Sequence, residues 1–477
     1  MALAKDILGK YTPTIGIECH VQLKTKTKLF SAVSNDARQA EPNSLISHID
    51  TGMPGALPVM NQAALELAVR AAFALNTEPQ KFSKFDRKHY FYPDLPKGYQ
   101  ITQYEDPIIK GGWVEFPMDG GFKKVNITRV HMEEDAGKNT HPDGADYSLV
   151  DLNRAGTPLL EIVGEPDIHS PAEAKAYARE LYLIMKYADV SDVDLYHGNM
   201  RFDVNISLSA KAGQLGKRTE VKNLNSFRSV ENAVNYEINR QAELYEKGEV
   251  VVQETRGWDD AKQKTISQRG KEEAYDYRYM PEPDIPPLNL EDEFINGIKS
   301  AMPMLPVQIR EILNKLSIDP KVVEDILERA DVCGAVTSQA KTGDQAAAKR
   351  LAFWLIRTAE NIDDIKIAHK KVSKLSSMLE SSQLNSNAAQ AVFDAMLKTD
   401  KDPEQLAQEM NLLQVSDAAE IEKTVRQVLD ENPQAAADVK QGETKAIGFL
   451  IGQVMAKSQG KANPKLAQET IKKLLGL

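Results

Sequence analysis

The sequence of 477 residues has only two cysteines, Cys19 and Cys333, which lie far apart along the chain. Two cysteines cannot form a disulfide framework or a four-cysteine zinc site, and so low a number suits a reducing cytosol. No apolar run approaches the ~18 residues that a membrane-spanning helix needs. The first residues, MALAKDILGKYTP, lack the apolar core of a signal peptide. These absences predict a cytoplasmic protein with no membrane partner.

Positive charge is also in the minority, because 59 Lys and Arg face 69 Asp and Glu. The net charge of -10 excludes a uniformly basic coat for nucleic acid, but it leaves room for a local basic patch. With 42% hydrophobic and 27% charged residues, the composition is that of a globular protein rather than a disordered one.

The common nucleotide and nucleophile motifs are missing. No GxxxxGK[ST] occurs, and the nearest segment has Met132 in place of the first glycine and Asn139 in place of the hydroxyl residue. No GxGxxG or GxSxG is present either. Any nucleotide must therefore bind outside these motifs.

The first part of the chain contains predicted strands, which come in groups, and predicted helices. Apolar and polar residues alternate with period two in IGIECHVQL (15–23), RFDVNISLS (201–209) and VNITRVHMEED (125–135), which predicts three strands with one buried face each. Capping residues predict helices from Ser170 to about Ala188 and from Asn61 through Leu75, and a third helix runs from about Ser229 to Lys247. Because the strands come in groups, we expect an α+β fold with a mixed or antiparallel sheet.

A proline-rich run, MPEPDIPPL (280–288), ends this part and is interpreted as a stiff connector. Beyond it the composition shifts to Ala, Leu, Lys, Glu and Gln, which predicts helices. A weaker boundary falls near 399–405. The predicted domains are 1–290, 291–405 and 406–477.

Acids and a histidine gather on the polar faces of the predicted strands. Glu18 and His20 lie two apart on one strand, Glu133 and Asp203 lie on others, and Glu161 is embedded in the apolar run PLLEIVG. Several carboxylates and a histidine on one sheet face would suit a hard cation such as Mg²⁺. Taken singly, each acid is more commonly solvated or ion-paired. Glu161 is the exception, since burial of a carboxylate is costly without a partner.

Three further segments are candidates for binding. The loop at 87–104 combines tyrosines with lysines and could grip a nucleotide or RNA end, or could simply be a packed loop. The stretch at 216–229 could hold phosphates or form an exposed charged ladder, with Arg218, Glu220 and Lys222 on one strand face. Six lysines against two glutamates in 441–477 could place that module on an RNA backbone, or could be a solvated helix surface.

Together these stretches resemble one family, the B subunit of the aspartyl/glutamyl-tRNA(Asn/Gln) amidotransferase (GatB). The matching pieces, in consistent order, are IGIECHVQLKTKTKLFS (15–31), MPGALPVMN (53–61), KHYFYPDLPKGYQITQ (88–103), RVHMEEDAGK (129–138), VDLNRAGTPLLEIV (150–163), NMRFDVNIS (199–207), TEVKNLNSF (219–227), YDYRYMPEPDIPPL (275–288) and KANPKL (461–466).

The resemblance implies a cradle-shaped kinase and transamidase domain, a helical domain and an all-α YqeY-like tail. It implies a heterotrimer with an amidase (the A subunit) and a small third chain (the C subunit). The B subunit would use ATP to phosphorylate the side-chain carboxylate of Glu-tRNA(Gln) or Asp-tRNA(Asn), and would amidate it with ammonia from the amidase. No DNA partner is implied. The rival functions are a stand-alone Mg²⁺-dependent phosphohydrolase and a non-catalytic tRNA-binding scaffold.

Carried over residue by residue, the resemblance assigns Mg²⁺ to His20, Glu133 and Glu161, with Glu18 and Asp203 beside them as catalytic residues. It assigns ATP and the tRNA 3′ end to the two binding segments and the body of tRNA to the tail. The binding candidates are Tyr92, Lys97, Tyr99, Arg218, Glu220, Lys222 and Asn223, with Lys457, Lys461 and Lys465 in the tail.

One departure from the family concerns zinc. Many members carry four zinc-binding cysteines before the PGALP turn, where this sequence has Ser31, Val33, Ser47 and Asp50. His48 and Asp50 are too few and too hard to replace four thiolates. We therefore expect no zinc, and we expect packing to hold this segment instead.

Overall fold

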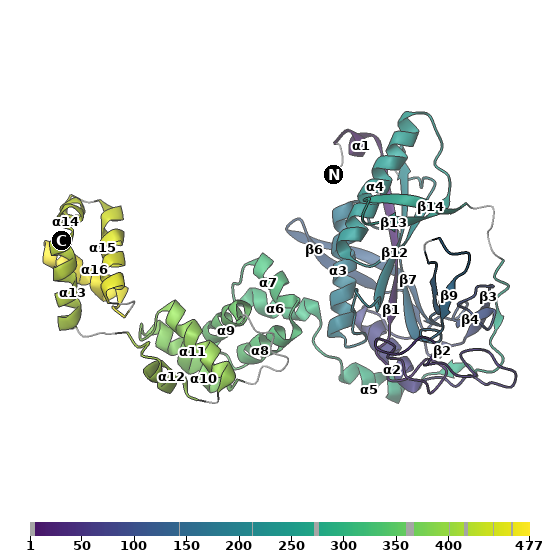
Figure 1. The fold of residues 1–477 in the computed structure, drawn as a ribbon, viewed down its shortest axis with the longest axis horizontal. Helices are drawn as coiled ribbons and strands as arrows, with labels where there is room; N and C mark the ends of the chain where they lie inside the picture. Colours follow the sequence, from purple (N-terminus) through teal and green to yellow (C-terminus); the bar gives the residue numbers. More distant parts are fainter. Residues whose placement is uncertain are drawn as a thin grey trace. The chain divides into compact units, whose positions relative to one another are not determined.

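The computed structural model describes residues 5–142, 144–211, 213–270, 276–358, 367–399, 401–414, 418–441, 443–458 and 461–477. The chain forms two compact units, Met1–Pro306 and Val307–Leu477, which are coloured from purple to teal and from green to yellow in Figure 1. Among the helices of the described residues, none is long and apolar enough to cross a membrane.

The first unit is built on a sheet of twelve strands in the order β14-β13-β12-β11-β1-β10-β7-β4-β3-β15, with β5 and β6 also paired to β7. Only β12 and β13 pair in parallel; the other recorded pairs are antiparallel. The predicted α+β fold with a mixed sheet is therefore confirmed. The strands are β1 (Thr12–Gln22), β3 (Asp86–His89), β4 (Tyr99–Thr102), β5 (Ile109–Lys110), β6 (Trp113–Met118), β7 (Gly121–Glu134), β10 (Pro158–Gly164), β11 (Met200–Ser209), β12 (Thr219–Leu224), β13 (Glu254–Asp259), β14 (Lys264–Gly270) and β15 (Met280–Pro281).

Helices cover one face of this sheet. α3 (Pro171–Tyr187) and α4 (Phe227–Glu246) lie alongside it in Figure 1, and α4 contacts β11, β12 and β14. The alternate residues Ile15, Ile17, Cys19 and Val21 of β1 are buried in the core. Because successive side chains of a strand point to opposite faces, the intervening residues of β1 face away from the helices. The sheet thus has an apolar face and a polar face.

The helix starts follow the capping signals. Ser170 accepts a hydrogen bond from the Glu173 amide at the start of α3, and Asn61 caps α2 (Gln62–Ala74). The third predicted helix starts earlier than expected. Ser226, rather than a residue near Ser229, is its N-cap, since the Ser226 hydroxyl accepts from the Ser229 amide. The first unit also contains α1 (Lys5–Lys10) and α5 (Asp292–Ser300).

The proline-rich run is more than a connector. Its first residues form β15 at the edge of the large sheet, where Pro281 pairs with Asp86. An edge position tolerates proline because one side of the strand needs no donor. At its other end, β16 (Leu288–Asn289) pairs with β2 (Phe82–Ser83). A further small pair consists of β8 (Lys138–Thr140) and β9 (Leu149–Asp151).

The buried ammonium group of Lys28 stabilises the segment in which many members of the resembled family bind zinc. The side chain of Lys28 is fully buried; its Nζ donates to the Leu45 carbonyl at 2.7 Å and lies 3.4 Å from Asp50 Oδ2. Asp50 also accepts from the Ser31 hydroxyl at 3.0 Å and the Ser47 amide at 2.8 Å. These contacts, rather than packing alone, join the two ends of the segment. The absence of zinc stays a prediction.

The second unit consists of helices throughout its described residues. They are α6 (Pro306–Lys315), α7 (Pro320–Leu327), α8 (Ala330–Ala340), α9 (Gln345–Arg357), α10 (His369–Glu380), α11 (Ser386–Lys398), α12 (Pro403–Glu409), α13 (Ala418–Glu431), α14 (Pro433–Lys440), α15 (Thr444–Lys457) and α16 (Pro464–Leu475). Buried residues between Ile421 and Ile471 form a core of their own. The last four helices therefore pack around one another. The three-domain division stays a prediction.

Candidate active site

Three neighbouring strands bring two histidines to one carboxylate. In the antiparallel register, His20 of β1 pairs with Glu161 of β10, and Glu161 pairs with His131 of β7. Directly paired residues project from the same face, so the three side chains meet on the polar face of the sheet. The Nε2 atoms of both histidines lie 3.4 Å from Glu161 Oε2.

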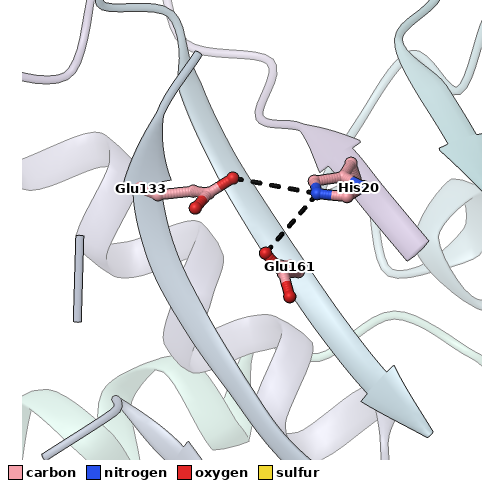
Figure 2. A group of neighbouring side chains, drawn as sticks. All are labelled: His20, Glu133 and Glu161. Carbon is pink, nitrogen blue, oxygen red and sulfur yellow. Dashed lines mark ion pairs between the residues drawn. The ribbon is translucent and has the colours of Figure 1, made fainter. Parts of the chain in front are cut away.

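Glu133 completes this cluster from β7. Its Oε1 lies 3.9 Å from His20 Nε2 and its Oε2 lies 3.6 Å from His131 Nε2. Figure 2 shows His20 facing both Glu133 and Glu161. The side chains are 6–15% exposed, so water reaches them but does not surround them. The three predicted metal ligands, distant in sequence, therefore converge.

In this cluster, burial and the neighbouring charges shift each pKa in opposite directions. Burial by itself would lower the pKa of His131, but its contacts with Glu133 and Glu161 outweigh burial and raise the pKa to about 9. The pKa of His20 is raised in the same way, against burial, chiefly by Glu161. Burial would raise the pKa of Glu161, but the two histidines hold it well below its usual value. The carboxylates of the cluster therefore favour the protonated form of both histidines.

The geometry of the cluster fits a divalent cation. One ligand atom from each of His20, Glu133 and Glu161 can be chosen so that all three lie within 4.8 Å of one another. Octahedral Mg²⁺ has ligands at ~2.1 Å, so that ligand pairs are about 3.0 Å apart when adjacent and about 4.2 Å when opposite. The contacts of His20 with Glu161 at 3.4 Å and Glu133 at 3.9 Å lie between these limits. Small side-chain movements would therefore suffice to enclose the ion.

Glu18 and Asp203 do not join this cluster but form a second one with Glu220. The ligand atoms of these three acids also lie within 4.8 Å of one another. Lys222 Nζ lies 3.2 Å from both Asp203 Oδ2 and Glu220 Oε1. The Asn223 amide donates to Asp203 Oδ1 at 2.8 Å. The predicted catalytic residues thus divide between two neighbouring groups, which are linked by Glu18 and His20 on β1.

Glu18 has the electrostatic properties of a proton acceptor. Burial raises the pKa of Glu18, and the negative charges of Glu161, Asp203 and Glu220 raise it further. The Asn205 side-chain amide donates to Glu18 Oε1 at 3.1 Å and orients the carboxyl group. A carboxyl group with a raised pKa is suited to general acid–base work.

The other predicted binding residues are spread around the sheet. Lys97 forms an ion pair with Glu134 and is buried with it. Tyr99 stacks under the Arg87 guanidinium at 4.3 Å, and half of the Tyr92 surface is exposed. Arg218 is exposed and lies one residue before β12, so the expected three-residue strand ladder is reduced to Glu220 and Lys222.

Sequence reasoning missed two residues of the polar face. Arg201 is the register partner of His20 on β11, and its guanidinium donates two hydrogen bonds to Asp135 at 2.9 and 3.1 Å. His131 lies two residues before Glu133 in the predicted strand 125–135, so alternation puts both on one face, but His131 was not part of the predicted site. The sequence contains a signal for both residues. Each is a polar residue in a segment of period-two alternation, on the same strand face as a candidate site residue.

The tail lysines differ in their surroundings. Lys457 Nζ donates to Glu431 at 2.6 Å, so its charge is partly used within the tail. Lys461 follows α15 and is partly exposed, whereas Lys465 lies on the exposed face of the first turn of α16. The latter two lysines are therefore the better candidates for an external anion.

Comparisons with known proteins agree with this architecture. The family described as the GatB/GatE catalytic domain matches residues 13–296, and the one described as the GatB domain matches residues 332–475. The B subunit of the aspartyl/glutamyl-tRNA(Asn/Gln) amidotransferase from Carboxydothermus hydrogenoformans is 40% identical, covering 98% of this chain and 99% of its own length. Proteins of the same name from Thermotoga petrophila and Brevibacillus brevis are 43% and 41% identical, with the same coverage of both chains.

The sheet domain, its carboxylate and histidine clusters and the helical tail thus define a protein of the tRNA-dependent amidotransferase class. Within that class, the chain belongs to the GatB family, whose curated members are named as B subunits. The resemblance seen in the sequence is confirmed. The name of these relatives makes them parts of a multi-subunit enzyme.

Proposed function

We propose that this chain is the B subunit of a cytoplasmic heterotrimeric amidotransferase that converts misacylated Glu-tRNA(Gln), Asp-tRNA(Asn) or both to the amidated form. Its partners would be the amidase (the A subunit), which releases ammonia from glutamine, and the small C subunit. The observation that carries the proposal is the convergence of His20, Glu133 and Glu161 on one sheet face of a chain that belongs to the GatB family.

The reaction needs ATP because a carboxylate is a poor acyl electrophile. The γ-phosphoryl group passes to a side-chain carboxylate oxygen of the aminoacyl group, giving an acyl phosphate and ADP. Ammonia then attacks the carbonyl carbon, phosphate leaves with the oxygen, and a proton is lost from nitrogen to give the amide. The protein must therefore position two anionic substrates and accept a proton.

The residues divide this work between the two clusters. His20, Glu133 and Glu161 would hold Mg²⁺, which when bound neutralises charge on the phosphoryl oxygens. Glu18 is placed to accept the proton from the attacking ammonia, since its pKa is raised by burial and by its acidic neighbours. Asp203 and Glu220 hold the Lys222 ammonium beside it, where it can meet a phosphate oxygen.

Binding of the larger substrates would extend over the neighbouring segments. The loop with Tyr92, Lys97 and Tyr99 and the stretch Arg218–Asn223 would contact ATP and the tRNA 3′ end. Aromatic faces stack on bases and cations bind phosphates, so both segments have the needed chemistry. The tail after residue 406 would contact the body of tRNA through Lys461 and Lys465, with Lys457 as a weaker contributor.

The test is reconstitution with both partner chains, with Glu161→Gln as the variant and Glu115→Gln as the control. Glu115 is an exposed residue of β6. We expect Glu161→Gln to abolish formation of the acyl phosphate while tRNA affinity is largely kept, because the change removes charge but little surface. Glu115→Gln should behave like wild type. The amide formed on each misacylated tRNA identifies the substrate.

Two outcomes would favour the rival functions. Rapid ATP hydrolysis by the isolated chain, indifferent to aminoacyl-tRNA, would indicate a stand-alone phosphohydrolase. Unaltered amidation by the Glu161→Gln complex would indicate that the carboxylates are structural and that the chain is a tRNA-binding scaffold.

A further inference from the structure

Arg201 is a charged residue of the polar face that belongs to neither cluster. On β11 it is the register partner of His20, and His20 is in turn the partner of Glu161 on β10. Directly paired residues project from the same face of a sheet. Arg201, His20 and Glu161 therefore form one row across three strands, and Arg201 lies beside the proposed metal site.

The ion pair of Arg201 carries its guanidinium across the sheet. The two terminal nitrogens donate to the Asp135 carboxylate at 2.9 and 3.1 Å. Asp135 directly follows β7, and the strands β1 and β10 lie between β7 and β11. Adjacent strands are ~4.8 Å apart, so the two side chains meet above the intervening strands rather than beside them. His20 interacts electrostatically with both Arg201 and Asp135. The guanidinium therefore lies on the polar side of β1 and β10, close to the cluster that contains His20.

A second guanidinium shares the carboxylate of Asp135. Arg154 Nε lies 3.4 Å from Asp135 Oδ2, and Arg154 is held there by hydrogen bonds to the carbonyl oxygens of Ala136 and Gly137 at 3.0 and 2.7 Å. Burial would raise the pKa of Asp135, but Arg201 and Arg154 hold it below its usual value. Two positive charges thus share one negative charge, so Asp135 does not need the whole charge of Arg201.

The other acids near Arg201 have closer partners of their own. Asp203 lies 3.2 Å from the Lys222 ammonium, and Glu133 faces the two histidines of its cluster. Burial would lower the pKa of Arg201, but Asp135, Asp203 and Glu133 raise it. Arg201 therefore stays charged, and it lies between the two clusters to which Glu133 and Asp203 belong.

The guanidinium of Arg201 keeps donors for an external group. An arginine has five N–H groups, and Asp135 accepts from two of them. Within the described part of the chain, the other three have no acceptor. The side chain is 20% exposed, so a ligand on the polar face can reach it. Because the donors form a planar fork, they match the oxygens of a phosphoryl group or a carboxylate.

Of these two oxyanions, the phosphoryl group fits the reaction better. The substrate carboxylate must attack phosphorus through one of its oxygens, and a guanidinium fork that holds both oxygens would make it a poorer nucleophile. The phosphoryl group instead carries negative charge past Glu18, Asp203 and Glu220, which would repel it. A fixed arginine that meets this charge during transfer lowers the barrier, as in other phosphoryl-transfer enzymes.

We propose that Arg201 is a catalytic residue that donates hydrogen bonds to the γ-phosphoryl oxygens of ATP while this group passes to the substrate carboxylate. In that step a carboxylate oxygen forms the bond to phosphorus, the bond from phosphorus to the β–γ bridging oxygen breaks, and ADP leaves with the electron pair. Arg201 transfers no proton. This assignment rests on the proposed function and adds to it a residue that contacts the transferred group.

The test compares the affinities of the reconstituted complex for ADP and for ADP with aluminium fluoride, which mimics the transferred phosphoryl group. Both are measured by calorimetry with Mg²⁺ present. The variant is Arg201→Lys, which keeps the charge but loses the fork. The matched control is Arg256→Lys, because Arg256 is also a buried, ion-paired arginine of the large sheet. Its Nε lies 3.1 Å from Glu237 of α4, on the helix-covered face.

We expect wild type and Arg256→Lys to bind the fluoroaluminate complex more tightly than ADP alone, by the same factor. In Arg201→Lys, affinity for the fluoroaluminate complex and kcat for amidation should each fall about 100-fold, as when one donor to a transition-state oxyanion is removed. Affinity for ADP should be unchanged, which also shows that the variant is folded. As a second measurement, millimolar guanidinium ion should restore part of the amidation activity of Arg201→Ala and should leave wild type unaffected.

Several results would overturn the assignment. One is an equal loss of affinity for ADP and for the fluoroaluminate complex in Arg201→Lys, and another is no loss of either. A higher KM for Glu-tRNA(Gln), with fluoroaluminate affinity retained, would place the guanidinium on the substrate carboxylate instead. Absence of any rescue of Arg201→Ala would assign Arg201 a structural role. A wild-type complex that forms no amide on either misacylated tRNA would overturn the proposed function as well, whereas these variant results in an active wild-type background would overturn this inference alone.

Discussion

His20 and His131 approach the same oxygen of Glu161 from the strands on either side of it, each with Nε2 at 3.4 Å. His131 also lies 3.6 Å from the Glu133 oxygen that His20 does not face. If an ion binds between His20 and the two carboxylates, His131 can still donate a hydrogen bond to these carboxylates from the strand on the other side. It would thus orient both ligands without touching the ion.

The first prediction concerns this orienting contact. His131→Phe should weaken Mn²⁺ binding about 10- to 100-fold, the usual loss when a residue that orients metal ligands is removed. His131→Gln keeps an N–H donor on its side-chain amide and should restore part of the affinity. Titration of the full chain with Mn²⁺, followed by electron paramagnetic resonance, measures the dissociation constant directly. Equal affinities in wild type and His131→Phe would contradict the orienting role.

The second prediction concerns pH in the absence of metal. The pKa of His131 is raised to about 9 in the folded chain from its usual 6.5, so the folded state binds the proton more tightly than the unfolded state. The resulting stabilisation is fully present below pH 6.5 and is lost as the pH rises through 9.

Urea unfolding in EDTA at pH 6 and pH 9 measures this effect against His131→Gln, which has no proton to lose. The free energy of unfolding of wild type, relative to that of the variant, should be lower at pH 9 than at pH 6. A constant difference would show that His131 is not held as imidazolium.

The third prediction concerns the segment braced by Lys28. Lys28→Met should lower the free energy of unfolding by about 3 kcal/mol, because it leaves the buried Asp50 carboxylate without its cation. Lys26→Met is the control, since Lys26 is exposed nearby. Calorimetry measures both variants. Metal analysis of the purified wild type should find no bound zinc; a stoichiometric amount would show that the prediction for this segment is wrong.

The fourth prediction concerns the tail. Replacement of both Lys461 and Lys465 by Gln should weaken tRNA binding and reduce the slope of log affinity against log salt by up to about 2, because each lysine–phosphate contact releases roughly one counterion. The exposed pair Lys321 and Lys341 of the second unit serves as the control. Filter binding over a range of salt concentrations gives the slopes. An unchanged slope would remove these two lysines from tRNA recognition.

Local patterns in the sequence were sufficient to predict several strands and helices. Period-two alternation predicted β1 and β11, and the Ser170 and Asn61 caps gave the starts of two helices, because both signals depend on neighbouring residues only. The start of α4 was predicted too late, since Ser226 and Ser229 are both plausible caps and only the backbone hydrogen bond distinguishes them. The pairing of Met280 and Pro281 at a sheet edge was likewise invisible, because the edge belongs to a distant segment.

The sequence by itself thus determined which residues face the polar side of the three predicted strands, and it singled out His20, Glu133 and Glu161, with Glu18 and Asp203, as candidates. Only the tertiary structure decided that Glu18 and Asp203 belong to a separate cluster with Glu220, and that His131 and Arg201 stand beside the proposed metal ligands. The reason is physical. Alternation is a property of a single strand, whereas the register between strands is set by core packing and by hydrogen bonds between segments far apart along the chain.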